Sequence, residues 1–167
     1  NMNETMYEID VPIREKPLDM AIKYSNLNWP IFPVHYPVNN GCSCRDTKCS
    51  KIGKHPIGKL VNNGHKDATT DPQQIDLWWK ENPKANIGII TGNETFYVLD
   101  IDIANGKQGD ESLNKLEKEY GKLPVTLQAR SGSGGRHYFF KYSGERLGCR
   151  TDILRNNSGI DFKGDGG

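Results

Sequence analysis

Residues 95–102 read TFYVLDID, a run of apolar and aromatic side chains that ends in two aspartates. Such a run, preceded by the turn signal Gly92-Asn93, predicts a β-strand. Successive side chains of a strand point to opposite faces, so Asp100 and Asp102 share one face and Ile101 points to the other. At a rise of about 3.3 Å per residue, the two aspartate Cα atoms are about 6.6 Å apart. Two carboxylates at this spacing can share Mg²⁺ ions and support in-line phosphoryl displacement.

The segments around this strand alternate between strand and helix patterns. Thr70-Asp71-Pro72 is a helix start, with a capping side chain before a proline in the first turn. Trp78 and Trp79 on that helix are expected to anchor the core. In the third helix, Leu113, Leu116 and Tyr120 are expected to face inward. The expected strands are 30–36, 85–91, 95–102, 125–130, 137–141 and 159–163, and the expected helices are 17–28, 71–82 and 110–120.

This order of elements predicts the α+β class, with a mixed, mostly antiparallel sheet and flanking helices. Pro33 cannot donate to a central ladder, so the strand 30–36 is expected to be short or at an edge. The chain has 167 residues, a length typical of one domain, and we expect residues 1–167 to form a single one. The chain stops in a turn signal, which predicts that the natural protein continues beyond it.

Composition and charge narrow the function class. No apolar run approaches the ~18 residues that a membrane span requires. The first ten residues, NMNETMYEID, lack the apolar segment of a signal peptide, so we expect a cytoplasmic protein. The net charge is +1, but residues 41–66 carry six basic and one acidic side chain, whereas residues 67–120 carry five and eleven. A basic loop beside an acidic region suits a polyanion held next to a carboxylate metal site.

Three of the four cysteines lie in one polar loop, residues 37–66. Cys42, Cys44, Cys49 and His55 give the spacing C-x-C-x4-C-x5-H. Zn²⁺ takes four cysteine or histidine ligands in a tetrahedron, and a long loop without its own core needs such an organiser. The sequence therefore predicts a structural zinc site, in which Cys149 and His65 are alternatives to His55 as the fourth ligand.

A glycine-rich turn, SGSGG at 131–135, stands between two of the expected strands and leads directly into Arg136 and His137. Glycines let backbone N–H groups approach a phosphate closely, so this turn predicts an anion site to which His137 adds a donor. Asp161, on the last expected strand, supplies a third carboxylate.

Taken together, these segments resemble the N-terminal domain of bifunctional DNA primase/polymerases, the prim-pol branch of the archaeo-eukaryotic primases. The resemblance runs in order from about Ala21 to Gly167. Its motifs are NWPIFPV (28–34), GKHP (53–56), DATTDPQQIDLWW (67–79), NIGIITG (86–92), YVLDID (97–102), LPVT (123–126), SGSGGRHYFF (131–140) and GIDFKGDGG (159–167).

The resemblance implies a modified RNA-recognition-motif-like core and assigns roles to residues. It implies that Asp100, Asp102 and Asp161 bind catalytic Mg²⁺ or Mn²⁺ and that His137 contacts the phosphates of the incoming nucleotide. Lys54, Ser133 and Arg136 are candidates for the same anion. The cysteine loop resembles the zinc-bearing version found in phage and plasmid members. The family's segment after GDGG is missing here.

The function implied is template-dependent nucleotidyl transfer, as a DNA primase and polymerase of plasmid- or phage-type replication. Its partners would be a single-stranded DNA template, nucleoside triphosphates and a helicase domain or protein, in a bacterial, phage or plasmid context. One alternative is a non-catalytic, zinc-stabilised module of replication initiation that binds single-stranded nucleic acid. A rolling-circle endonuclease would need a His-x-His pair, and Arg136-His137-Tyr138 offers one histidine.

Overall fold

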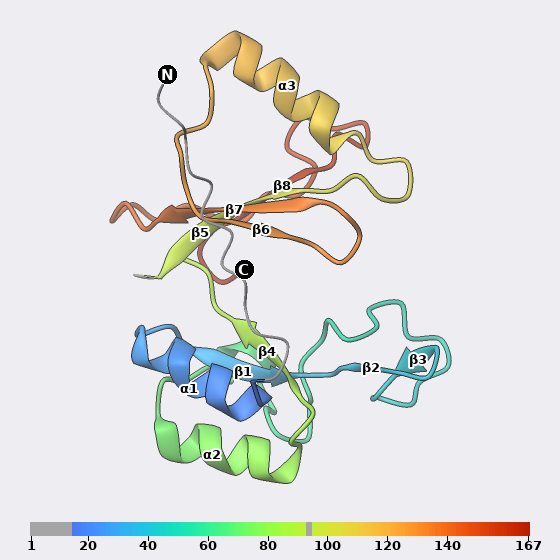
Figure 1. Ribbon diagram of the computed structural model, residues 1–167, viewed down its shortest axis with the longest axis vertical. Coiled ribbons are helices and arrows are strands. Elements are labelled where there is room, and N and C mark those ends of the chain that lie inside the picture. Colours follow the sequence, from blue (N-terminus) through green and yellow to red (C-terminus); the bar gives the residue numbers. More distant parts are fainter. Residues whose placement is uncertain (1–14, 93–94) are drawn as a thin grey trace. The chain divides into compact units, whose positions relative to one another are not determined.

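The computed structural model describes residues 15–92 and 95–167, so the first ten residues and Asn93 of the expected turn lie outside it. Its elements confirm the α+β class, with three α-helices and antiparallel strand pairs in the described part of the chain (Figure 1). The strands divide among separate sheets. The described residues form two compact units, an N-terminal unit from Glu15 to Ile90 and a C-terminal unit from Thr91 to Gly167.

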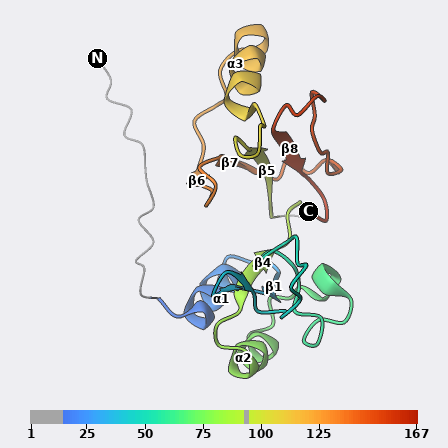
Figure 2. The same cartoon turned by 90° about the vertical axis from the view of Figure 1, so that its right-hand side faces the viewer.

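The N-terminal unit is built on a two-stranded sheet. Strand β1 (Ile31–Val34) pairs antiparallel with β4 (Asn86–Ile89). Helices α1 (Pro17–Asn26) and α2 (Pro72–Glu81) pack beside each other against these strands (Figure 2). The Asp71 carboxylate accepts a hydrogen bond from Gln73 N at 3.0 Å, which is the expected cap of α2.

Two tryptophans of α2 anchor the core of this unit, as expected. Trp78 and Trp79 are buried, and their indole N–H groups donate to the carbonyls of Leu60 and Ala85, each at 3.1 Å. These bonds satisfy the polar end of each ring, so burial of its apolar body carries no unpaired donor. The other buried members of the core are Ala21, Ile31, Ile57, Val61, Ile75 and Ala85.

The basic loop has its own short elements and is fixed to the core at its far end. Strands β2 (Pro37–Val38) and β3 (Gly41–Cys42) form a hairpin whose turn residues Asn39 and Asn40 both have positive φ, as a type I′ turn requires. A 3₁₀ helix, η1 (Gly64–Asp67), follows later. Ile57 and Val61 are 1% exposed, so the chain after the cysteines is held by the core.

The C-terminal unit contains a four-stranded antiparallel sheet in the order β6-β7-β5-β8. Its strands are β5 (Phe96–Ile101), β6 (Gln128–Arg130), β7 (Arg136–Lys141) and β8 (Ile160–Lys163). Strands β6 and β7 form the expected hairpin around the glycine-rich turn. Strand β5 lies in the middle, between β7 and β8, so its side chains have neighbours on both sides.

Helix α3 (Gly109–Tyr120) covers one face of this sheet (Figure 1). Leu113 and Leu116 of the helix pack with Ile101, Tyr138 and Ile160 of the sheet. The alternate residues of the same strands, among them Asp100, His137 and Asp161, therefore belong to the opposite face.

The prediction for one core residue of α3 is wrong. Tyr120, the last residue of the helix, is 76% exposed. Gly121, whose φ is +95°, follows as the C-cap, and Leu113 and Leu116 are the helix residues that pack into the core described above. Among the described residues, no helix combines the length and apolar character that crossing a membrane requires.

Candidate functional site

Three of the expected site residues lie in one row across the four-stranded sheet. Asp100 of β5 is paired in register with His137 of β7 on one side and with Asp161 of β8 on the other. Residues directly opposite each other in an antiparallel pair project to the same face. This carboxylate row, in the order His137, Asp100 and Asp161, therefore presents one imidazole and two carboxylates on the face opposite α3.

Each of the three carboxylates engages one cationic or ionisable side chain. Asp100 Oδ1 lies 3.3 Å from His137 Nε2, Asp102 Oδ2 lies 2.8 Å from Lys107 Nζ, and Asp161 Oδ2 lies 3.1 Å from Lys163 Nζ. The aspartate side chains remain between 21% and 30% exposed. The hydrogen bond to Asp102 is the main cause that raises the pKa of Lys107, partly offset by burial, and the charges of Asp161 and Asp100 also contribute.

Asp102 stands just beyond the end of β5, where the chain turns toward α3. Its Oδ1 accepts a hydrogen bond from Ala104 N at 3.0 Å while Oδ2 binds Lys107. In the described part of the chain, the ligand atoms of the three aspartates do not form a group within 4.8 Å of one another. Each aspartate instead has an oxygen close to its own partner, which is His137 for Asp100, Lys107 for Asp102 and Lys163 for Asp161.

The glycine-rich turn passes directly beside the end of β5. A side-chain Cβ at Gly135 would lie 2.3 Å from the carbonyl oxygen of Ile101 and 3.4 Å from the Cα of Asp102. Only glycine permits that approach. Ser131 N donates to the Gly135 carbonyl at 2.8 Å, and the hydroxyls of Ser131 and Ser133 are 3.1 Å apart and exposed.

Arg136 lies on the face of β7 opposite to His137. Its guanidinium pairs with Asp110 of α3 and lies over the Tyr138 ring, 5.9 Å from its centroid. Phe139 shares the face of His137, with ring centroids 6.4 Å apart. The structure thus brings His137 to the carboxylate row and gives Arg136 a partner on the helix.

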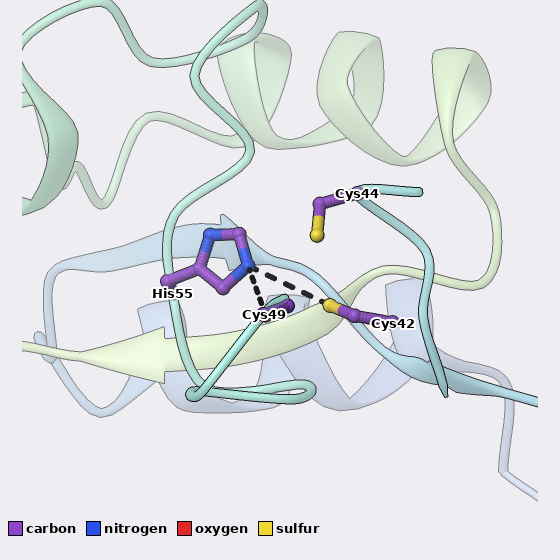
Figure 3. A group of neighbouring side chains, drawn as sticks. All are labelled: Cys42, Cys44, Cys49 and His55. Carbon is purple, nitrogen blue, oxygen red and sulfur yellow. Dashed lines mark hydrogen bonds between the residues drawn. The ribbon is translucent and has the colours of Figure 1, made fainter. Parts of the chain in front are cut away.

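The cysteine cluster of the N-terminal unit forms the second candidate site. The ligand atoms of Cys42, Cys44, Cys49 and His55 all lie within 4.8 Å of one another, and Figure 3 shows the four side chains pointing toward a common centre. His55 Nε2 is 3.5 Å from both Cys42 Sγ and Cys49 Sγ. Zn–S bonds of 2.3 Å and Zn–N bonds of 2.0–2.1 Å at tetrahedral angles place sulfur and nitrogen about 3.6 Å apart. The group therefore fits zinc.

Hydrogen bonds around the cluster favour a thiolate at Cys42. Burial alone raises the pKa of this thiol, but bonds from the backbone N–H groups of Gly53 and Cys44, with further bonds to the Cys44 and His55 side chains, lower it to about 6. The pKa of Cys49 is raised, first by burial and then by its cysteine neighbours. A cysteine binds zinc as the thiolate, so the lowered pKa of Cys42 favours the form that binds the metal.

A second histidine supports the proposed ligand His55. The rings of His35 and His55 have centroids 4.5 Å apart, and His35 Nδ1 is 2.7 Å from Ser43 Oγ. The backbone N–H of His35 donates to the His55 carbonyl at 2.9 Å. The pKa of His35 is lowered, mainly by burial and then by the charges of His55 and Lys59. His35, the residue that follows β1, thereby holds the backbone and one face of His55.

Lys54, His65 and Cys149 are not members of the carboxylate row or of the cysteine cluster. Lys54, whose backbone N–H donates to Lys51 O, belongs to the N-terminal unit with the cysteine cluster. His65 lies in η1 and is not part of the cluster. Cys149 belongs to the C-terminal unit, where its thiol lies 3.8 Å from the carbonyl of Asp165. Of the three candidates for the fourth ligand, His55 is the one that joins the cysteines.

Comparison with known proteins identifies the family. The family model described as "Bifunctional DNA primase/polymerase, N-terminal" matches residues 21–167. The chain belongs to the prim-pol family. Membership of this family indicates a nucleotidyltransferase of the primase/polymerase type. The match covers both units, so the carboxylate row and the cysteine cluster both lie in the prim-pol region.

The curated proteins that match differ from one another in kind. A Beta-mannosidase B from Neosartorya fischeri is 24% identical over 116 residues, which are 70% of this prim-pol chain and 12% of that protein. A Threonine--tRNA ligase from Thermotoga petrophila is 25% identical over 152 residues, covering 81% of this chain and 22% of that protein. The chain thus spans less than a quarter of the length of these relatives. No solved structure gives a significant match.

Sequence reasoning missed the lysines that face the carboxylates. Lys107 follows Asp102 by five residues in an irregular turn, and its contact depends on the fold of that turn. Lys163 stands two residues after Asp161 on β8, a spacing that places both side chains on one strand face and could have been read from the sequence.

Proposed function

We propose that this prim-pol chain is a template-dependent nucleotidyltransferase domain that synthesises and extends primers during plasmid- or phage-type DNA replication. The observation that carries the proposal is the row in which Asp100 is flanked in register by His137 and Asp161. A face lined by carboxylates and one imidazole suits a reaction in which charge develops on transferred phosphate oxygens.

In this proposal Asp100, Asp102 and Asp161 hold the divalent cations. Carboxylate oxygens are the ligands that Mg²⁺ and Mn²⁺ prefer. In the structure each of these carboxylates already lies beside a lysine or histidine, which indicates that the face attracts positive charge. Bound there, Mg²⁺ or Mn²⁺ would supply charge neutralisation at the attacking and leaving oxygens of an in-line displacement. The protein then contributes position and electrostatics, with no covalent intermediate.

His137 and the glycine-rich turn would bind the triphosphate. His137 is 37% exposed and stands beside Asp100, so its ring N–H can donate to a phosphate oxygen. Ser133 offers an exposed hydroxyl in the turn that passes beside Asp102. Phe139 contributes an aromatic edge next to His137, on the side away from the turn.

The basic loop of the N-terminal unit would contact template phosphates. Its net charge comes from Arg45, Lys48, Lys51, Lys54, Lys59 and Lys66 against the single acid Asp46. Phosphate contacts of this kind give sequence-independent and salt-dependent binding to single strands. Structural Zn²⁺ on Cys42, Cys44, Cys49 and His55 would hold the loop in shape, and a helicase would supply single-stranded template in the cytoplasm.

The proposal is tested by Asp100→Asn in a primer-synthesis assay on single-stranded DNA with labelled nucleotides. Loss of one metal ligand removes several kcal/mol of transition-state stabilisation, so we expect product formation to fall by about a hundredfold or more. The matched control is Asp110→Asn, an aspartate of the same unit that pairs with Arg136 on the helix-covered face. Extension by Asp100→Asn at the wild-type rate would contradict the proposal.

The alternative of a non-catalytic binding module rests on the basic loop, which needs none of the three aspartates. The same experiment separates the two functions. If the wild-type chain binds single-stranded DNA but adds no nucleotide with Mg²⁺ or Mn²⁺, the binding module is favoured. In the enzyme, Asp100→Asn loses synthesis while its affinity for single-stranded DNA is retained.

A further inference from the structure

The segment 152–159, DILRNNSG, leads into β8 through an unusual backbone. Asp152, Arg155, Asn156 and Asn157 have φ values of +49°, +64°, +54° and +59°, three of them consecutive. The left-handed region costs most residues with a side chain about 1–2 kcal/mol, whereas Asp and Asn adopt it more readily because their side chains form local hydrogen bonds. Such a segment keeps its shape only if other interactions hold it.

The side chain of Asp152 supplies those interactions. Its Oδ1 accepts hydrogen bonds from Ser158 N at 2.7 Å and from Ser158 Oγ at 2.6 Å, and its Oδ2 accepts one from Asn157 N at 3.2 Å. Ser158 is 4% exposed. One carboxylate thus closes the loop by binding two residues near its other end.

The backbone of the same residue contacts a proposed metal ligand. Asp152 N donates to Asp161 Oδ1 at 2.8 Å, while Asp161 Oδ2 faces Lys163. Both oxygens of Asp161 are therefore engaged, one by the loop and one by its own strand. The orientation of the Asp161 carboxylate depends on where the closed loop places this N–H group.

The far end of the loop reaches the second proposed ligand. Asp102 N donates to the Gly159 carbonyl at 2.7 Å, and Gln108 N donates to the Asn157 carbonyl at 3.1 Å. A Cβ at Gly159 would lie 2.3 Å from the carbonyl oxygen of Asp102. The loop is packed directly against the backbone that carries Asp102.

We propose that Asp152 is a positioning residue, whose carboxylate closes the loop 152–159 so that its own N–H group holds the Asp161 carboxylate in a fixed orientation. The proposal rests on the proposed function in one respect, namely that Asp161 binds a divalent cation. A role confined to stability would change unfolding alone, whereas a positioning role changes metal affinity in the folded protein.

The experiment is a titration of the full chain with Mn²⁺, followed by electron paramagnetic resonance, for the wild type, Asp152→Ala and Asp152→Asn. Asparagine keeps the Oδ1 acceptor for Ser158 and alanine removes all three bonds. We expect Asp152→Ala to bind Mn²⁺ about tenfold more weakly, as for loss of one hydrogen bond to a charged group, and Asp152→Asn to stay within about threefold of the wild type. Asp71→Ala, which removes a comparable carboxylate–backbone bond in the N-terminal unit, should leave Mn²⁺ affinity unchanged.

Wild-type Mn²⁺ affinity in folded Asp152→Ala would overturn the proposal, and so would equal losses in the alanine and asparagine variants. If Asp152→Ala does not fold, Ser158→Ala removes a single bond to Oδ1, and wild-type affinity there would also overturn it. Hydrogen exchange of the Asp152 amide gives a readout that needs no metal. Protection of this amide in the wild type that is lost in Asp152→Ala supports the positioning role. This result is independent of the proposed function, which would be refuted if the wild type did not bind Mn²⁺. Equal exchange in both proteins would overturn the positioning role.

Discussion

Replacing one ligand of the cysteine cluster should weaken zinc binding by an amount that can be calculated. In Cys49→Ala, three of the four ligand atoms that lie within 4.8 Å of one another remain. Structural zinc sites bind with about 10–16 kcal/mol. If the four ligands share this free energy equally, losing one costs about 2.5–4 kcal/mol, which weakens zinc binding about a hundredfold to a thousandfold.

The assay is competition for zinc with a chromophoric chelator, on protein purified without added metal. The wild type should carry about one zinc per chain, as a closed four-ligand site requires. Cys149→Ala is the matched control, because it removes the one cysteine that lies in the C-terminal unit, outside the cluster. Retention of wild-type zinc affinity by Cys49→Ala, or an equal loss in Cys149→Ala, would refute the assignment.

The effect of zinc loss on folding should be local. The chain after His55 is held by backbone bonds to β1, including Ile57 N to Pro33 O at 3.1 Å, and by the buried side chains of Ile57 and Val61. The hydrophobic cluster that contains Ile57 and Val61 includes none of the cysteines. Circular dichroism of Cys49→Ala should therefore retain the helical signal, and a cooperative loss of helix on chelation would contradict this view.

Two further predictions concern the C-terminal unit. His137→Ala should raise the KM for nucleotide about tenfold to a hundredfold, as for a lost charged hydrogen bond, without changing the affinity for single-stranded template; loss of template binding with unchanged KM would contradict the role. Hydrogen bonds from Lys122 and then Leu123 N lower the pKa of Glu117 below 4.5, so its contribution to stability is present above about pH 4.5 and is lost as pH falls through the lowered pKa. In urea denaturation, Glu117→Gln should be less stable than the wild type at pH 7 and approach it at acid pH, and a gap that widens in acid would count against the ion pair.

The sequence predicted the elements whose signals are local. The alternation along 96–101 placed Asp100 on a face opposite Ile101, and the Asp71-Pro72 signal placed the start of α2. The prediction that Tyr120 faces the core was wrong, because a helical pattern does not indicate where the sheet surface beneath the helix ends. Strands β4 and β5, although close in the sequence, belong to different sheets because each pairs with a distant strand.

The remaining features depend on contacts between distant residues. The spacing of Cys42, Cys44 and Cys49 indicated a metal site, but the reach of a loop could not choose among His55, His65 and Cys149, and the fold makes that choice. Nothing local indicated that Asp152 would contact Asp161, because the two meet only when the loop closes. Single-domain organisation and the roles of the site residues stay predictions.

The register of the central strand ties the carboxylate row to correct folding. Asp100 faces both His137 and Asp161 only in the observed alignment of β5 with its two neighbours. A slip of one residue in β7 would move His137 to the helix-covered face and expose Tyr138, and a slip in β8 would bury Asp161 among leucines. A chain with this error would both lose the carboxylate row and bury a charge, so misaligned molecules would be less stable. Single-residue insertions within β7 or β8 should therefore be selected against.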